Sequence, residues 1–323
     1  MSILSTVEVF LETGFVFSII AMGYYISYHI LDFPDLTVEG TFLSGAVTFG
    51  LFASKGLNPW LGLLAAMLVG SLFGALTGVL HVALKIRPLL CGILVSTSLI
   101  TVNLIAVSAG TAGGFSGQAS SSISYGRTVK TLHDYFFGGA VPAKVNNIGL
   151  RDLLIFLLVT LVCKLLLDMY LKTKSGLLLR AAGSNEQFVK MLGINPGKSK
   201  IIGLAIGNAC AAVSGALYTH ISGNVNQSMG IGTIVIGLAS LIIGMSLFGK
   251  VKFMKPTTKV IIGSIIYQAC LTAAQKLGVP YTAAFHVQPE NITSSIHMGR
   301  QAWVNDGIYV WVRHYVYQYC AHV

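Results

Sequence analysis

Charged side chains are scarce in this chain of 323 residues, because Asp, Glu, Lys and Arg together make up 10% of it and hydrophobic residues make up 54%. Soluble domains carry about 25% charged residues, so this composition excludes an ordinary soluble globular protein. The chain also lacks the segments of about 10 residues with alternating polarity that build a membrane-spanning β-barrel. Its apolar runs approach the roughly 20 residues that cross a bilayer as a helix. The sequence therefore predicts an all-α polytopic membrane protein.

Eight apolar segments predict about eight transmembrane helices, and a break within one of them is an open alternative. They cover residues 10–30, 38–54, 59–84, 88–110, 151–172, 200–221, 230–249 and 258–278. These segments predict a transmembrane domain over residues 1–280, followed by an atypical tail at 281–323. The tail holds four of the eight histidines and no clean apolar span. Because these histidines are widely spaced and lack acidic or cysteine partners at ligand spacing, we expect no metal site.

Paired cysteines are also missing from the chain. None of the five cysteines forms a CxxC motif, and most lie within or beside apolar runs, at Cys91, Cys163, Cys210, Cys270 and Cys320. They are typical of small core residues rather than of a disulfide or metal framework. A cleaved signal peptide needs a basic start, but Glu8 and Glu12 precede the first lysine, Lys55. We expect the first helix to be retained, and we expect no cofactor.

Basic residues gather in some connections between apolar segments and are absent from others. The connections at 172–200 and 250–259 hold six and four basic residues, whereas the connection at 222–229 holds none. Because lysine and arginine favour the cytoplasmic side, a loop at 173–199 is predicted to be cytoplasmic and a loop at 111–150 external. The same distribution explains the net charge of +10 without nucleic-acid binding.

A nucleotide-binding loop is lacking as well. Residues 244–250, GMSLFGK, match the glycine and lysine spacing of a phosphate-binding loop, but Val251 follows where Ser or Thr is needed. The segment also ends an apolar span instead of following a strand. We therefore do not expect an enzyme, and any ATP that drives this protein must be hydrolysed by a separate chain.

A short polar-edged segment, RAAGSNEQFVKMLGIN at residues 180–195, stands between two long apolar runs. Ser184 and Gln187 form a capping-box pattern, and Gly193 is placed to end a helix in a left-handed cap. Between them fit about two turns of helix, roughly 12 Å long. A helix this short is marginal alone in water, so we expect it to dock on another surface.

The surface on which this helix docks is either the lipid headgroup layer or a groove in a partner protein. Phe188, Met191 and Leu192 share one face by helical spacing, and Glu186 and Lys190 take the other side. Three apolar residues would bind lipid weakly. A groove in a partner protein would bind such a face. The residues alone leave both alternatives open.

A second polar stretch, MGYYISYHILDFPDLTVEGTFLSG at residues 22–45, places three acids where two apolar runs meet. Pro34 interrupts a helix and disfavours helical backbone at Phe33. The stretch is either a cytoplasmic turn with solvated acids or a broken helix beside a translocation pathway. Asn103 is a further pathway candidate, because an unpaired amide is costly to bury. The pathway candidates are Phe33, Pro34, Asp35, Thr37, Glu39 and Asn103.

Gly70, Gly74 and Gly78 recur once per turn in the third apolar segment. Such a small-residue face lets another helix approach closely. The neighbouring helix is either in the same subunit, the interpretation we favour, or in a second subunit.

Residues 177–220, LLLRAAGSNEQFVKMLGINPGKSKIIGLAIGNACAAVSGALYTH, resemble the cytoplasmic coupling region of ABC importer permeases of the branched-chain amino acid and ribose-type family. In that family a short helix couples the permease to its ATPase, so the resemblance implies a coupling helix over Asn185–Leu192. The candidate coupling residues are Arg180, Ala181, Gly183, Ser184, Asn185, Glu186, Phe188, Met191, Leu192, Gly193, Ile194 and Asn195.

The phrase FPDLTVEG at residues 33–40 resembles more closely a subgroup similar to permeases paired with tryptophan- and tyrosine-binding lipoproteins. The resemblance covers about residues 10–280. It implies an importer permease of the bacterial inner membrane, for aromatic or else branched-chain amino acids, with sugars or nucleosides third. The implied partners are ABC ATPase subunits, an extracytoplasmic binding lipoprotein and a second permease copy. The alternative is an ATP-independent secondary transporter or channel.

Overall fold

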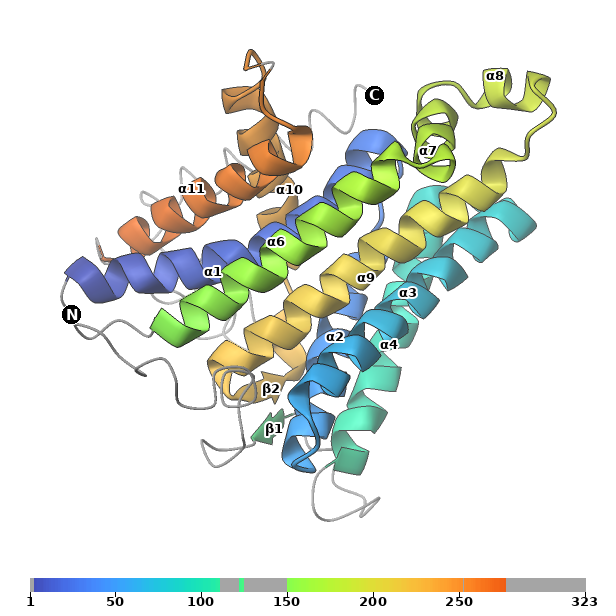
Figure 1. The fold of residues 1–323 in the computed structure, drawn as a ribbon. Coiled ribbons are helices and arrows are strands. Elements are labelled where there is room, and N and C mark those ends of the chain that lie inside the picture. The colour runs from blue at the N-terminus through green and yellow to red at the C-terminus, as the bar shows by residue number, and fades with distance from the viewer. Residues whose placement is uncertain (1–2, 111–121, 125–149, 252, 277–323) are drawn as a thin grey trace, which may run out of the picture. The chain divides into compact units, whose positions relative to one another are not determined.

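The computed structural model describes residues 3–110, 122–124, 150–251 and 253–276, all within one compact unit, Met1–Leu277 (Figure 1). The tail at 281–323 and most of the loop at 111–150 lie outside the described residues. The helices are α1 (Ile3–Tyr24), the π-helical η1 (Tyr25–Ile30), α2 (Thr37–Ser54), α3 (Pro59–Leu84), α4 (Pro88–Gly110), α6 (Leu150–Lys172), α7 (Lys174–Ser184), α8 (Glu186–Met191), α9 (Pro196–Ser222), the 3-10 turn η2 (Gln227–Gly230), α10 (Thr233–Leu247) and α11 (Pro256–Lys276). The strands are β1 (Ser122–Ser124) and β2 (Asn224–Asn226).

Seven helices among the described residues are long and apolar enough to cross a membrane. They cover Thr6–Ile30, Pro59–Leu84, Pro88–Ser108, Asp152–Lys172, Pro196–Ser222, Gln227–Leu247 and Pro256–Gln275. The predicted all-α, multi-pass architecture is therefore confirmed. The remaining expected segment, 38–54, is the 18-residue helix α2, which includes Glu39 and is mostly buried by its neighbours.

Helix α9 packs closely against α3, and the two run side by side in Figure 1. A Cβ added to Gly74 would overlap the carbonyl oxygen of Leu204, and one added to Gly78 would press on Ile201. The glycine face of the third apolar segment is therefore filled by α9 of the same subunit. This confirms the interpretation favoured from the sequence.

Helix α1 is packed on two sides. The Ser264 hydroxyl of α11 donates to the carbonyl oxygen of Gly14 at 2.9 Å. The Thr160 hydroxyl of α6 donates to the carbonyl oxygen of Phe15 at 3.0 Å. In both bonds a backbone carbonyl accepts from a side-chain hydroxyl. Each hydroxyl therefore has the hydrogen-bond partner that a buried polar group needs.

A two-stranded antiparallel ribbon joins the 111–150 loop to the connection between α9 and α10. Ile123 lies opposite Val225, and both side chains are buried together with Leu43, Val47 and Val107. This strand pairing was not predicted from the sequence. It fixes the start of η2 and α10 beside α2.

Candidate functional site

Two short helices, α7 and α8, connect α6 to α9 (Figure 1). Only the second was predicted. The Thr173 hydroxyl caps α7 by accepting a hydrogen bond from the Gly176 N–H at 3.2 Å. Leu179 is fully buried, and Gly183 lies directly against the carbonyl oxygen of Ile30. The connection is therefore anchored on the end of η1.

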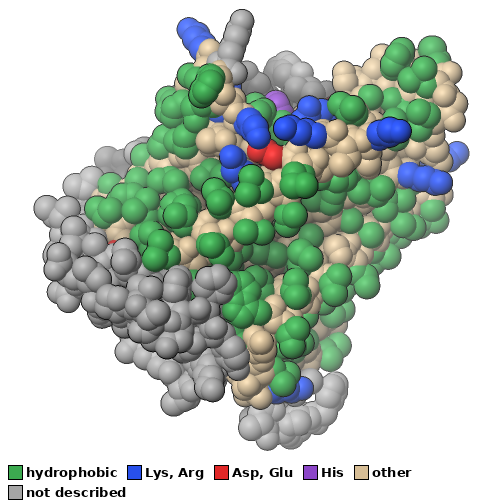
Figure 2. Space-filling view, in the orientation of Figure 1, with side chains coloured by type: hydrophobic (Ala, Val, Ile, Leu, Met, Phe, Trp, Pro, Cys, Tyr) green, Lys and Arg blue, Asp and Glu red, His purple; other side chains and the backbone are tan. Residues whose placement is uncertain are grey.

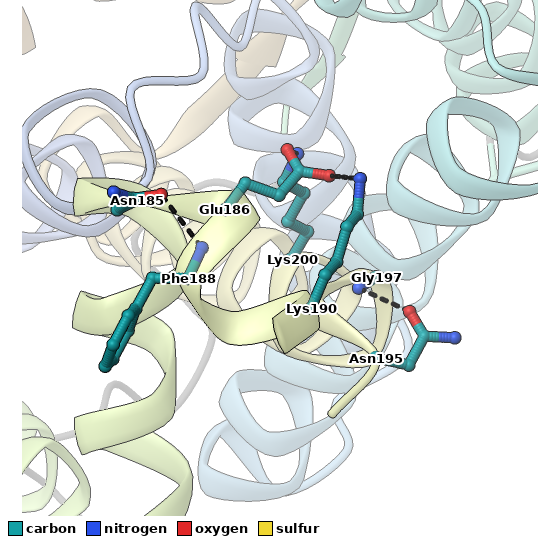
Figure 3. Close-up of polar contacts among 7 residues, drawn as sticks. All are labelled: Asn185, Glu186, Phe188, Lys190, Asn195, Gly197 and Lys200. Carbon is teal, nitrogen blue, oxygen red and sulfur yellow. Dashed lines mark hydrogen bonds and ion pairs between the residues drawn. The ribbon is translucent and has the colours of Figure 1, made fainter. Parts of the chain in front are cut away.

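Asn185 caps the start of α8, and the predicted cap at Ser184 is wrong. The Asn185 side chain accepts a hydrogen bond from the Phe188 N–H at 2.9 Å (Figure 3). Its backbone is extended, with φ −152° and ψ 97°, as a cap residue requires. Ser184 is the last residue of α7, so its backbone is already helical. The predicted capping box with Gln187 therefore does not form.

Gly193 ends α8 in the predicted left-handed conformation, with φ 74°. The Gly193 N–H donates to the carbonyl oxygen of Lys190 at 3.0 Å, and the Ile194 N–H donates to that of Val189 at 3.3 Å. These two bonds form a Schellman motif. Asn195 then caps α9 by accepting from the Gly197 N–H at 2.9 Å (Figure 3).

Glu186 ties α8 to the first turn of α9. Its carboxylate pairs with the Lys200 ammonium at 2.7 Å and with the Lys190 ammonium at 2.9 Å (Figure 3). The hydrogen bonds from Lys200 and then from Lys190 lower the pKa of Glu186 from 4.5 to about 2. The carboxylate therefore stays ionised near neutral pH, and both ion pairs persist there.

The apolar face of α8 is exposed within the described part of the chain. Val189 is fully buried under the helix. The large exposed side chains are Phe188 at 54%, Met191 at 82%, Leu192 at 58% and Ile194 at 41%. Hydrophobic side chains lie at the end of the molecule that carries α8, as they do over the rest of this face (Figure 2). A fixed helix with an exposed apolar face is typical of a docking site.

Residues 31–36 form the predicted break between η1 and α2. The Phe33 and Asp35 side chains are only 3% and 2% exposed. The Phe33 ring packs edge-on against His81 of α3, with 5.2 Å between ring centroids. Asp32 and Pro34 are exposed. A simple solvated turn does not describe this segment, because its central acid, Asp35, is enclosed by protein.

Asp35 anchors the break to α9. Its carboxylate accepts hydrogen bonds from the Thr37 N–H at 2.9 Å and from the Asn208 side-chain amide at 2.6 Å. The Asn208 oxygen accepts in turn from the Thr41 hydroxyl at 2.8 Å. Asn208 was missed in the sequence, although an amide within the small apolar run GLAIGNACAA was a usable signal.

The other pathway candidates lie around the start of α2. The Thr37 hydroxyl contacts that of Thr77 at 2.9 Å. Asn103 is buried and donates to the carbonyl oxygen of Gly40 at 3.2 Å. Glu39 accepts from the Gly232 N–H at 2.8 Å, at the residue that precedes α10. The structure therefore brings the starts of two helices, α2 and α10, together at Glu39.

The family model described as "Branched-chain amino acid transport system / permease component" matches residues 6–299. The chain belongs to this permease family. With seven described helices able to span a membrane, the permease is a multi-pass protein of the bacterial inner membrane. It is the transport component of an ABC transporter rather than a catalytic enzyme.

Three relatives show how far the similarity of this permease extends. A tyrosine transport system permease protein of Clostridioides difficile is 38% identical, over 82% of this chain and 81% of its own length. A nucleoside ABC transporter permease of Lactococcus lactis is 28% identical over 76% and 74%. A guanosine ABC transporter permease of Bacillus subtilis is 26% identical over 65% and 66%. No solved structure matches the permease.

Proposed function

We propose that this permease is the membrane-spanning subunit of an ATP-driven importer of amino acids, aromatic ones first and branched-chain ones second. The support is its 38% identity to a relative named for tyrosine transport. The relatives named for nucleoside and guanosine transport are 28% and 26% identical. The amino-acid proposal follows the more similar of these relatives.

In this proposal a partner ABC ATPase hydrolyses ATP and grips α8 from the cytoplasm, so that the loop at 173–199 is cytoplasmic. The observation that carries it is the exposed apolar face of α8 on a helix fixed at both ends. The residues that would meet the ATPase are Phe188, Met191, Leu192 and Ile194. The residues that would hold or orient this face are Arg180, Ala181, Gly183, Ser184, Asn185, Glu186, Gly193 and Asn195.

An extracytoplasmic binding lipoprotein would deliver the substrate on the side of the 111–150 loop, and a second permease copy would close the pathway. We assign the wall of the pathway to the break at residues 31–36 and to the helices around it. The residues of this wall are Phe33, Pro34, Asp35, Thr37, Glu39 and Asn103. Alternating access would follow from movement of α8, because α7 packs against η1 directly before the break. The tail at 281–323 has no role in this proposal.

The test is copurification of the permease with its ATPase and ATP-driven uptake. The double substitution Phe188→Asp and Leu192→Asp should weaken ATPase binding at least about tenfold, because losing one interface hot spot costs about 2 kcal/mol. Gly193→Val should act in the same direction, since a β-branched residue is strained at φ 74°. Membrane insertion should be unchanged in each variant.

Leu57→Asp is the matched control, because Leu57 is 48% exposed in the turn between α2 and α3. That turn lies at the opposite end of α3 from the turn that leads to α4, which carries Lys85 and Arg87 and is therefore predicted to be cytoplasmic. The control should bind the ATPase as the unsubstituted permease does. Unchanged ATPase binding and uptake in the double variant would contradict the assignment of α8. Uptake that needs no ATP would favour a secondary transporter.

A further inference from the structure

Glu39 lies near the middle of the membrane-spanning bundle. Its neighbour Gly40 packs against Leu99, which is near the midpoint of α4. Thr41 donates to Asn208, near the midpoint of α9, at 2.8 Å. Both helices have the length of a membrane span. The carboxylate of Glu39 therefore lies far from either membrane surface.

Glu39 is only partly buried at this depth. The exposed side chains on the adjoining elements are Ile100 at 51%, Ile231 at 58% and Val235 at 51%. An ionisable side chain at mid-membrane almost always faces protein or a water-filled cavity, because facing lipid is costly. The surface around Glu39 is therefore poorly suited to face lipid, although the side chains next to Glu39 are apolar.

One hydrogen bond orients the carboxylate of Glu39, and the carboxylate can accept further hydrogen bonds. One oxygen accepts from the Gly232 N–H at 2.8 Å, and among the described residues the other oxygen meets no donor. Asp35, the other acid near this depth, has both oxygens occupied by Thr37 and Asn208. Only Glu39 of this pair is arranged to accept a hydrogen bond from a ligand.

We propose that Glu39 faces the aqueous pathway and binds the ammonium group of the transported amino acid. This inference rests on the proposed function, in which a second permease copy closes the other side of the pathway. An ammonium group donates charge-assisted hydrogen bonds to a carboxylate, which are stronger than neutral ones. The Gly232 N–H holds one oxygen in place, which leaves the other oxygen to accept a hydrogen bond from a ligand. Glu39 would thereby favour amino acids over neutral sugars or nucleosides.

The first test measures uptake of L-tyrosine by proteoliposomes that hold the permease with its ATPase and binding protein. Glu39→Gln should lower maximal uptake at least about tenfold, the loss expected for one hydrogen bond to a charged group. The concentration for half-maximal uptake, set by the binding protein, and ATPase copurification should stay unchanged. Glu39→Asp keeps the charge and should retain more uptake. Normal uptake by Glu39→Gln would overturn the ammonium contact.

The second test measures the rate at which a membrane-impermeant, cationic thiol reagent labels a substituted permease. The labelling rate of the unsubstituted permease is subtracted. Glu39→Cys should be labelled at least about tenfold faster than Leu72→Cys, because thiols react only as hydrated thiolates. Leu72 is the matched control, since it is 63% exposed near the midpoint of α3 among apolar neighbours. Equal labelling rates would overturn the aqueous position of Glu39.

The labelling experiment needs neither ATP nor partner proteins. A failure of ATP-driven uptake by the unsubstituted permease would therefore contradict the proposed function alone. In that case the ratio of labelling at Glu39→Cys to that at Leu72→Cys would still decide whether Glu39 meets water. The two proposals can thus fail separately.

Discussion

At the scale of single residues, Glu186 holds the short helix α8 in place although its own side chain is 40% exposed. Its carboxylate meets Lys190 of the same helix and Lys200 of the next one. Exposed ion pairs contribute about 0–1 kcal/mol each. The Lys200 side chain is only 16% exposed, so salt screens this pair less than a fully solvated one. Glu186 therefore orients α8 relative to α9 rather than stabilising the whole fold.

We predict that α8 becomes less ordered in acid. The folded-state pKa of Glu186 is lowered from 4.5 to about 2, so the ion pairs contribute fully above pH 4.5 and are lost as the pH falls toward 2. Amide hydrogen exchange over 186–194, corrected for intrinsic rates and compared with amides in the middle of α9, should show a step in this window. Glu186→Gln should remove the step. A step of equal size in that variant would contradict the role of Glu186.

The sequence predicts single residues well where the interaction is local. Gly193 was predicted because a left-handed cap depends on backbone conformation alone. The cap at Asn185 was missed because the end of α7, which decides it, cannot be read from a serine and glutamine spacing. The pair Asp35–Asn208 joins residues 173 positions apart, and Glu39 meets Gly232 across 193 positions. No local pattern contains these partners.

At the scale of elements, the contact between α3 and α9 depends on glycine. We predict that Gly74→Ala lowers the free energy of unfolding by about 1–3 kcal/mol, the range for overpacking, because the added Cβ would overlap the backbone of Leu204. Thermal unfolding in detergent measures this change.

Ser71→Ala on the same helix is the control for that substitution. Within the described part of the chain, the Ser71 hydroxyl bonds only to the carbonyl oxygen of Leu68 in its own helix, at 2.8 Å. Its replacement should change the free energy of unfolding by less than about 0.5 kcal/mol. Equal effects of the two substitutions would show that α3 and α9 tolerate the added Cβ.

Most helices were predictable because each long apolar run has one stable form in a membrane. The helix α7 was missed, since KSGLLLRAAGS is too short and too mixed to show a clear period. The β1–β2 pair was missed because it joins residues about 100 positions apart, Ile123 and Val225. Short elements such as these depend on tertiary packing rather than on their own sequence.

At the scale of the whole molecule, the distribution of basic residues predicts its orientation in the membrane. In intact cells a membrane-impermeant thiol reagent should label Leu57→Cys. It should label Met191→Cys only after the membrane has been permeabilised. Both positions are exposed, at 48% and 82%. Labelling at position 191 from outside would contradict both the orientation and the proposed ATPase contact.

Gly183 has a mechanical consequence for the permease. Any side chain there would overlap the carbonyl oxygen of Ile30, so α7 touches the last residue of η1 backbone to backbone. No soft side chain lies between them to absorb a displacement. A displacement of α8 that moves α7 would therefore be transmitted to residues 31–36 with little loss. In the proposed coupling, a larger residue at this position would force α7 away from η1 and so weaken the contact that carries movement of α8 to the break.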